Sequence, residues 1–205
     1  QSDSWFLMPD GLGISNQLEY SYNIDNKIEI FENWLTLDYN KNIFSAGIRF
    51  EAFQPNDPDP SVSRGKVRYA DIAYKYISVD IGDVEEGINI TAGNFYKLFA
   101  RGMILKSYED RNIRIDNNLL GVKLEANYKD FTLTALSGSA SNAVDERKDI
   151  LHAVDLQYRG FDIIKFGTSF ASNQPAIDGI ARTTLASFRV QPSIWNFDGY
   201  AEYGI

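Results

Sequence analysis

The sequence predicts an all-β protein, an antiparallel up-and-down transmembrane β-barrel of which about eleven strands are visible, an incomplete barrel. Three observations predict this class. Apolar and polar residues alternate along most of the chain, which sends them to opposite faces of a strand. Short turns and long links alternate between these segments, which gathers the short turns at one end of the sheet. Aromatic residues flank the short turns, as they do where strands leave a membrane.

The alternation is clearest between Phe44 and Ala52, where every second residue is apolar and the residues between them are small or charged. The same period of two recurs over residues 70–76, 121–128, 152–158, 164–170, 186–190 and 195–203. In the first of these it puts Ile72, Tyr74 and Tyr76 on the apolar face. Segments of roughly 8–12 residues suit a tilted strand that crosses a bilayer.

The links between these segments are of two kinds. Asn, Asp, Gly and Pro supply the special backbone angles of tight turns. We expect tight turns at residues 39–43, 128–131, 158–161 and 190–194, and long links at residues 54–66, 139–149 and 172–181.

Composition excludes several function classes. The 205 residues carry 20 basic and 28 acidic side chains, a net charge of −8, which argues against nucleic acid as a partner. There is no cysteine and one histidine, so disulfide scaffolds, thiolate chemistry and histidine metal clusters are excluded. That histidine, His152, falls on the apolar face of its segment beside Val154. We therefore expect no catalytic, cofactor or metal site and no enzyme activity.

The polar faces of the predicted strands carry charges of both signs. If the barrel is closed, these residues line its lumen: Arg49, Glu51, Asp71, Lys75, Lys123, Glu125, Asp155, Lys165 and Arg189. Two outcomes remain open. Cross-strand pairs of opposite charge fill a narrow interior, or the residues line a wet channel with a weak cation preference.

One stretch, residues 88–122, interrupts the meander. Its matching parts are Gly93-Asn94-Phe95-Tyr96, Phe99, Arg101-Gly102, Tyr108-Glu109 and Asp116-Asn117. On these residues the chain resembles a family of uncharacterised porin-like outer-membrane β-barrels of Bacteroidota and relatives. Lys97 and Ala100 depart from the acid and the glycine of that family. The resemblance implies fold and location, and it carries no assigned activity.

This stretch concentrates charged residues. The candidate constriction consists of Lys97, Arg101, Lys106, Glu109, Arg111, Arg114 and Asp116. One interpretation is a loop folded into the lumen whose charges narrow the pore and select solutes. The other is a structural latch, in which arginines and carboxylates pair to hold a long loop against the barrel wall.

We therefore expect an N-terminal segment, residues 1–13, followed by a transmembrane β-barrel portion, residues 14–205. No run of 18 apolar residues predicts a membrane helix. The expected location is the outer membrane of a Gram-negative bacterium. Because family members are longer and the last segment still alternates, we expect this chain to be the N-terminal part of a longer protein.

The expected partners are outer-membrane lipid, and further strands of the polypeptide or other outer-membrane proteins. The expected function is porin-like passage of small polar solutes. A non-conducting accessory subunit of an outer-membrane complex is the first alternative. A soluble β-sandwich binding module, in which the apolar face is the core, is the second.

Overall fold

The structure of the chain is a computed structural model that describes residues 9–25, 28–53, 70–111, 115–140, 147–177 and 179–205. The described residues form strands and turns without a helix. None of them lies in an apolar helix of membrane-spanning length. The chain divides into two compact units, residues 1–79 and residues 80–205.

The first unit contains β1 (Leu12–Asn23), β2 (Ile28–Lys41), β3 (Phe44–Phe53) and most of β4 (Ala70–Gly82). Consecutive strands pair in antiparallel fashion, and β1 pairs with β2 along its whole length. Asn42, in the tight turn between β2 and β3, has φ of 54°. Asn tolerates this left-handed conformation better than most residues, which explains why the turn falls there.

A β-bulge between β3 and β4 corrects part of the sequence prediction. Arg49 lies opposite Tyr74 and Phe50 lies opposite Ile72, so Ala73 is an extra residue in β4. An extra residue reverses the faces of everything beyond it. The ring of Tyr76 covers Gly47 on the polar face, where a Cβ would lie 2.4 Å from the ring.

The assignment of Tyr74 and Tyr76 to the apolar face is therefore wrong, and so is the assignment of Lys75 to the polar face. Lys75 lies opposite Ile48, on the apolar face.

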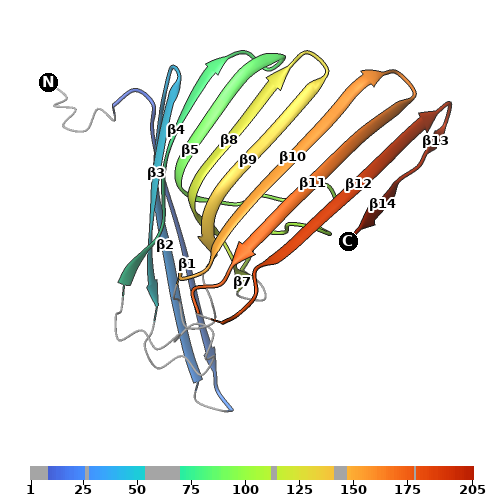
Figure 1. The fold of residues 1–205 in the computed structure, drawn as a ribbon. Coiled ribbons are helices and arrows are strands. Elements are labelled where there is room, and N and C mark those ends of the chain that lie inside the picture. The colour runs from blue at the N-terminus through green and yellow to red at the C-terminus, as the bar shows by residue number, and fades with distance from the viewer. Residues whose placement is uncertain (1–8, 26–27, 54–69, 112–114, 141–146, 178) are drawn as a thin grey trace, which may run out of the picture. The chain divides into compact units, whose positions relative to one another are not determined.

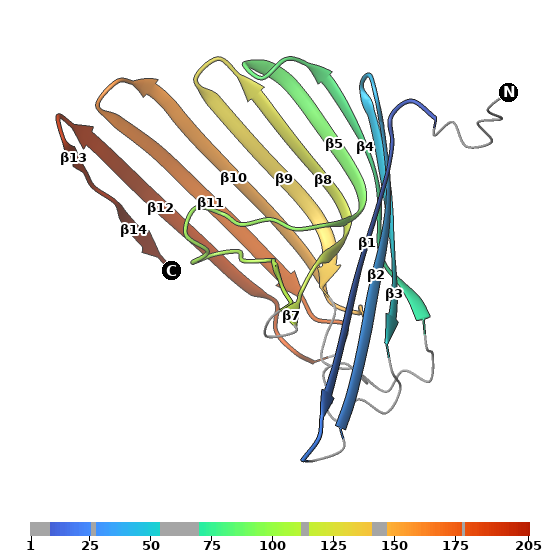
Figure 2. The same cartoon turned by 180° about the vertical axis from the view of Figure 1, so that it is seen from behind.

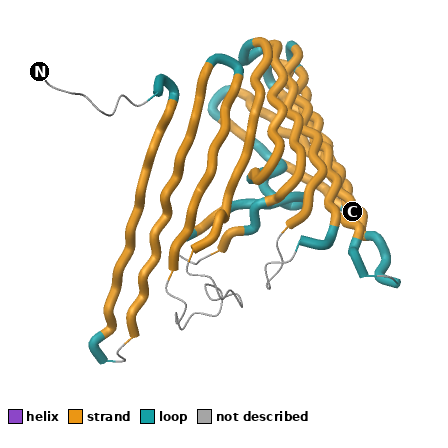
Figure 3. Tube along the Cα trace, turned by 90° about the vertical axis from the view of Figure 1, so that its left-hand side faces the viewer, coloured by secondary structure: helices purple, strands orange, loops and turns teal. Residues whose placement is uncertain are grey.

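The second unit contains the remaining long strands, which follow one another in sequence order (Figure 1). They are β5 (Glu86–Phe95), β8 (Leu119–Tyr128), β9 (Phe131–Ala140), β10 (Ile150–Phe161), β11 (Ile164–Gln174) and β12 (Thr183–Ile194). Two short pieces, β13 (Phe197–Asp198) and β14 (Ala201–Gly204), both pair with β12. Figure 3 shows strands, loops and turns, and no helix, among the described residues.

In its described residues the protein is therefore all-β, with an antiparallel up-and-down sheet of twelve strands. The sequence predicts about eleven, and the difference arises at the end of the chain. There the last row is broken into β13 and β14, which pair with the same strand. The strands between β1 and β12, apart from the two short ones β6 and β7, run for 10 to 14 residues.

Two tight turns lie further along the chain than the sequence predicts. β10 continues through a register shift to Phe161, so the turn is at residues 162–163 rather than 158–161. β12 includes Pro192 and runs to Ile194, so the next turn is at residues 195–196 rather than 190–194. In both places a turn-forming residue, Gly160 or Pro192, sits inside an extended strand, where local propensity predicts its end.

The two faces of the second unit have opposite chemistry, and the charged face is the buried one. Arg189 and Asp155 are 2 % and 3 % exposed. On the other face Leu156, Phe170 and Phe188 are 39 %, 47 % and 53 % exposed. This is the reverse of a water-soluble sheet, whose apolar face forms the core. Below, the face with Asp155 and Arg189 is called the polar face, and the face with Leu156 and Phe170 the apolar face.

Candidate functional site

The candidate site is the polar face of the second unit together with a stretch of chain that lies on it, the described residues 96–111 and 115–118, here called the crossing segment. It joins β5 to β8 and contains β6 (Glu109–Asp110) and β7 (Ile115–Asp116). Figure 2 shows it running across one face of the strands.

The first part of the crossing segment is a narrow hairpin. The N–H of Ser107 donates to the carbonyl of Lys97 (2.9 Å), and the N–H of Phe99 donates to the carbonyl of Leu105 (3.0 Å). The N–H of Gly102 donates to the carbonyl of Phe99 (2.8 Å), which closes the tip. Gly102 has φ of +87°, a left-handed value that glycine adopts without steric cost.

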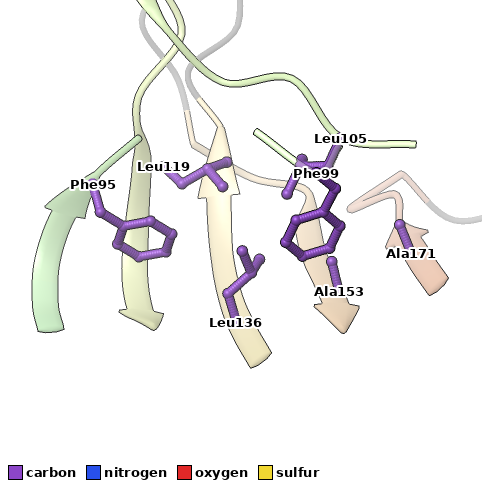
Figure 4. Packing of buried hydrophobic residues seen from close by; sticks show 7 residues of the cluster. All are labelled: Phe95, Phe99, Leu105, Leu119, Leu136, Ala153 and Ala171. Carbon is purple, nitrogen blue, oxygen red and sulfur yellow. The ribbon is translucent and has the colours of Figure 1, made fainter. Parts of the chain in front are cut away.

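An apolar cluster fastens this hairpin to the strands (Figure 4). Phe99 is 1 % exposed and Leu105 is 8 % exposed, although both belong to a loop. They pack with Leu136, Ala153 and Ala171, the second and third of which are two residues from Asp155 and Ser169. Since residues two apart share a strand face, the crossing segment lies on the polar face.

Polar contacts hold the base of the crossing segment. The hydroxyl of Tyr96 donates to Asp116 (2.9 Å), and the amide nitrogen of Asn94 donates to Oδ1 of Asn118 (2.7 Å). Arg147 donates from Nη2 to the same oxygen of Asn118 (2.7 Å) and from Nη1 to the Asn118 carbonyl (2.9 Å). Asn94 and Asn118 are 5 % and 4 % exposed, so the base of the loop is buried and hydrogen-bonded.

One carboxylate joins the crossing segment to β8. Glu125, on β8, accepts hydrogen bonds from the ammonium groups of Lys97 and Lys123. Lys97 comes from the crossing segment and Lys123 from the same strand as Glu125. Two cations therefore share one acid, and this cluster of three side chains carries a net positive charge.

Further along the polar face, Arg189 on β12 forms a two-pronged ion pair with Asp155 on β10. Its Nη1 lies 2.7 Å from Oδ1 and its Nη2 2.9 Å from Oδ2. Ser169, on the strand between them, donates to Oδ1 of Asp155 (2.5 Å). Gly167 makes room for the guanidinium, because a Cβ there would lie 2.4 Å from Cζ of Arg189.

The remaining residues of the predicted constriction have mostly local partners. Arg111 pairs with Glu109 (3.2 Å). Arg101 lies with Cζ 4.0 Å from the ring centroid of Tyr200, and Lys106 with Nζ 4.5 Å from that of Tyr108. Arg114 falls outside the described residues.

The predicted lumen residues divide between the two units. In the second unit, Lys165 lies on the polar face with Gly167 and Ser169, as the alternation predicts. In the first, Arg49 pairs with Glu51 on its own strand (2.9 Å), and Glu51 lies opposite Asp71.

The apolar face of the second unit carries a chain of aromatic rings near the tight turns. Ring centroids are 4.8 Å apart for Phe131 and Tyr158, 5.4 Å for Tyr158 and Phe161, and 6.1 Å for Phe161 and Phe166. Phe166 continues it to Phe188 (6.3 Å). The sequence predicts aromatic residues at this rim, and their contacts extend across four strands.

His152 is exposed on the same face, beside Val154. The expectation that it has no catalytic role stays a prediction.

The sequence prediction missed the residues that anchor the crossing segment, because it considered only the charged residues there. Phe99 and Leu105 are six residues apart within a charged loop, and their burial depends on the fold of the hairpin. Two apolar residues flanking an Arg-Gly pair were the available signal. Tyr200 and Arg147 carry no local signal, since their partners are distant in the sequence.

Comparison with known proteins gives one match. Residues 14–204 match a family described as "Family of unknown function (DUF6029)". No curated protein matches the chain. No solved structure matches it either. Because the match covers nearly the whole chain, the protein belongs to this family of unknown function, DUF6029.

Proposed function

We propose that the chain forms part of a porin-like β-barrel of the bacterial outer membrane that passes small polar solutes, with the crossing segment as its constriction. The observation that carries the proposal is the reversed burial of the second unit. A buried ion pair, Asp155 with Arg189, lies on one face, and exposed Leu156, Phe170 and Phe188 lie on the other. Lipid is the environment in which such an apolar face is stable.

The strand lengths and the aromatic rings support the same proposal. Strands of 10 to 12 residues in the second unit are long enough for a tilted crossing of the hydrocarbon layer. The rings of Phe131, Tyr158, Phe161 and Phe166 gather near the tight turns, as interfacial aromatic girdles do. In an up-and-down barrel the polar face encloses the lumen, which would make the crossing segment an obstruction inside it.

The contacts of the crossing segment favour a fixed constriction that is also a latch. Phe99 and Leu105 are buried against the strands, and Lys97 is paired with Glu125. A loop held by apolar packing at its tip and hydrogen bonds at its base stays in position while solutes pass. The two interpretations of its charges are thus compatible, since different residues serve each.

Closure of the sheet is part of the proposal. A strand edge facing lipid leaves N–H and C=O groups unsatisfied at a cost of several kcal/mol each. Further strands of the same polypeptide, or of a partner, would satisfy the outer edges at β1 and at β13 and β14.

The experiment has two steps. First, outer membranes are isolated, and the protein is extracted with detergent and run on gels with and without boiling. We expect outer-membrane partition and faster migration of the unboiled band. Second, the purified protein is inserted into planar bilayers, where discrete conductance steps are expected.

Each alternative has its own outcome. A detergent-dependent, heat-modifiable protein without conductance is the accessory subunit. A protein that stays soluble without detergent overturns the barrel and leaves the β-sandwich module.

A further inference from the structure

We infer that the constriction favours anions, and that Arg101 and Lys106 in the hairpin of the crossing segment determine this preference. The inference rests on the proposed function and names the class of solute for the same site: small anions, such as carboxylates and inorganic phosphate. It runs against the net charge of the whole chain, which is −8.

The charge of the crossing segment differs in sign from that of the chain. Its described residues include four cations, Lys97, Arg101, Lys106 and Arg111, against three carboxylates, Glu109, Asp110 and Asp116. Fixed charges at the narrowest part of a pore govern which ions enter, more than the charge of the exterior does.

Pairing leaves two cations of the hairpin, Arg101 and Lys106, without acid partners. Arg111 pairs with Glu109, and Lys97 shares Glu125 with Lys123. In the part of the chain that the structure describes, neither Arg101 nor Lys106 forms an ion pair. Both are exposed, so their charges are available to a solute.

Tyrosine rings hold both cations without neutralising them. The Arg101 guanidinium lies over Tyr200, and the Lys106 ammonium lies over Tyr108. A ring face attracts a cation through its quadrupole and leaves the full positive charge in place. The hydroxyl of Tyr200 donates to Glu202, and that carboxylate also accepts from Ser187 (2.8 Å).

Arg101 lies in the turn of the hairpin, and Lys106 lies opposite Leu98 on the strand that leaves this turn. A Cβ on Gly102 would lie 3.2 Å from Cβ and 3.4 Å from Cδ of Lys106. The aliphatic stem of Lys106 therefore crosses Gly102, the residue next to Arg101. Glu125, the carboxylate that joins the crossing segment to β8, already accepts from two ammonium groups.

The test measures ion selectivity of the purified full-length protein in planar bilayers. Under a potassium chloride gradient, the reversal potential of the wild type is expected to show a preference for chloride over potassium. The double variant Arg101→Gln with Lys106→Gln is expected to lose that preference. Arg101→Lys keeps the charge without the planar stack, and it should keep the preference.

Lys129→Gln is the matched control. Lys129 also rests on a tyrosine ring, with Nζ 5.1 Å from the centroid of Tyr128, but it lies in the tight turn between β8 and β9. We expect no change in reversal potential from this variant. Every variant is compared only after its unboiled band shows the wild-type shift.

The possible results distinguish failure of the anion preference from failure of the proposed porin function. The inference is overturned if the channel prefers potassium, or if its chloride preference is unchanged in the double variant of Arg101 and Lys106. Either result leaves the porin proposal in place. A wild-type protein that folds and does not conduct overturns both. If the double variant does not fold, the wild-type reversal potential alone decides, since a cation preference contradicts the inference.

Discussion

Arg189 and Asp155 are 34 residues apart in sequence and form a two-pronged ion pair across β11, with the side chains 2 % and 4 % exposed. The pair is possible because Gly167 on the intervening strand has no side chain. It ties β10, β11 and β12 together on the polar face, independently of the backbone ladder.

Removing one member of this pair should destabilise the protein strongly. Asp155→Asn leaves the buried guanidinium without its counter-charge, a change that costs about 3–5 kcal/mol in buried pairs. Unfolding in urea from detergent or lipid measures the loss. The double variant Asp155→Leu with Arg189→Met should be far less destabilised than the sum of its single changes. Additive losses would contradict a direct pair.

Gly167→Ala should disturb the same pair without touching either charge. The new Cβ would lie 2.4 Å from Cζ of Arg189, so the guanidinium must leave Asp155. We expect a loss of roughly 1–3 kcal/mol, typical of overpacking. In an Arg189→Met background the same change should cost clearly less, and an equal cost in both backgrounds would rule out the proposed contact.

Phe99→Ala should release the crossing segment while leaving the strands paired. Truncating a buried phenylalanine costs about 3–5 kcal/mol of stability. Here the loss should weaken the packing of the hairpin on the strands. The expected results are faster proteolysis within residues 96–108 and larger, noisier conductance. Leu98→Ala is the control, because Leu98 is 48 % exposed on the same hairpin. If both variants behave alike, Phe99 is not the anchor.

The turn between β4 and β5 should respond to acid. The N–H groups of Glu86 (2.8 Å) and Glu85 (3.0 Å) donate to Asp83 and hold the pKa of its carboxyl below the usual value. Because the folded-state pKa is lowered, this contribution is complete above the ordinary pKa of about 4 and lost as pH falls through the folded value.

The measurement is an NMR titration of the amide signals of Glu85 and Glu86. They should shift as the pH is lowered through the acid range. Asp83→Asn keeps the acceptor oxygen and loses the titrating carboxyl, so the same signals should move less than in the wild type. Equal movement in both proteins would mean that Asp83 does not control the turn.

The sequence predicts the all-β antiparallel fold because alternation is a local property. In β10, His152, Val154 and Leu156 face one way and Asp155 the other, as the pattern requires. In β4 the alternation predicts the wrong face for the residues that follow Ala73. Nothing local marks Ala73 as a bulge, which is fixed by pairing with β3, and Lys75 consequently moves to the apolar face.

The sequence predicts which segment carries the charges of the site, but it does not predict which residues pair. The charges of residues 97–116 indicate a segment that contacts the polar face of the strands, and Lys97 does form an ion pair with Glu125. Which residues pair depends on strand register, so the partnership of Arg189 with Asp155 cannot be read from either strand alone. The apolar anchors Phe99 and Leu105 were missed because a buried hairpin in a loop has no periodic signal.

The central claim is that the apolar face meets lipid and the polar face does not. The chain contains no cysteine, so a single nitroxide label can be attached at any new cysteine. Ala186→Cys, Phe188→Cys and Val190→Cys report the apolar face of β12, and Ser187→Cys reports the polar face.

Collision rates with oxygen, which concentrates in lipid, are compared with those of a water-soluble nickel complex in vesicles. We expect the collision rate with oxygen to exceed that with the nickel complex at residues 186, 188 and 190, and to fall at residue 187. Dominance of the nickel complex at the three apolar-face positions would contradict it.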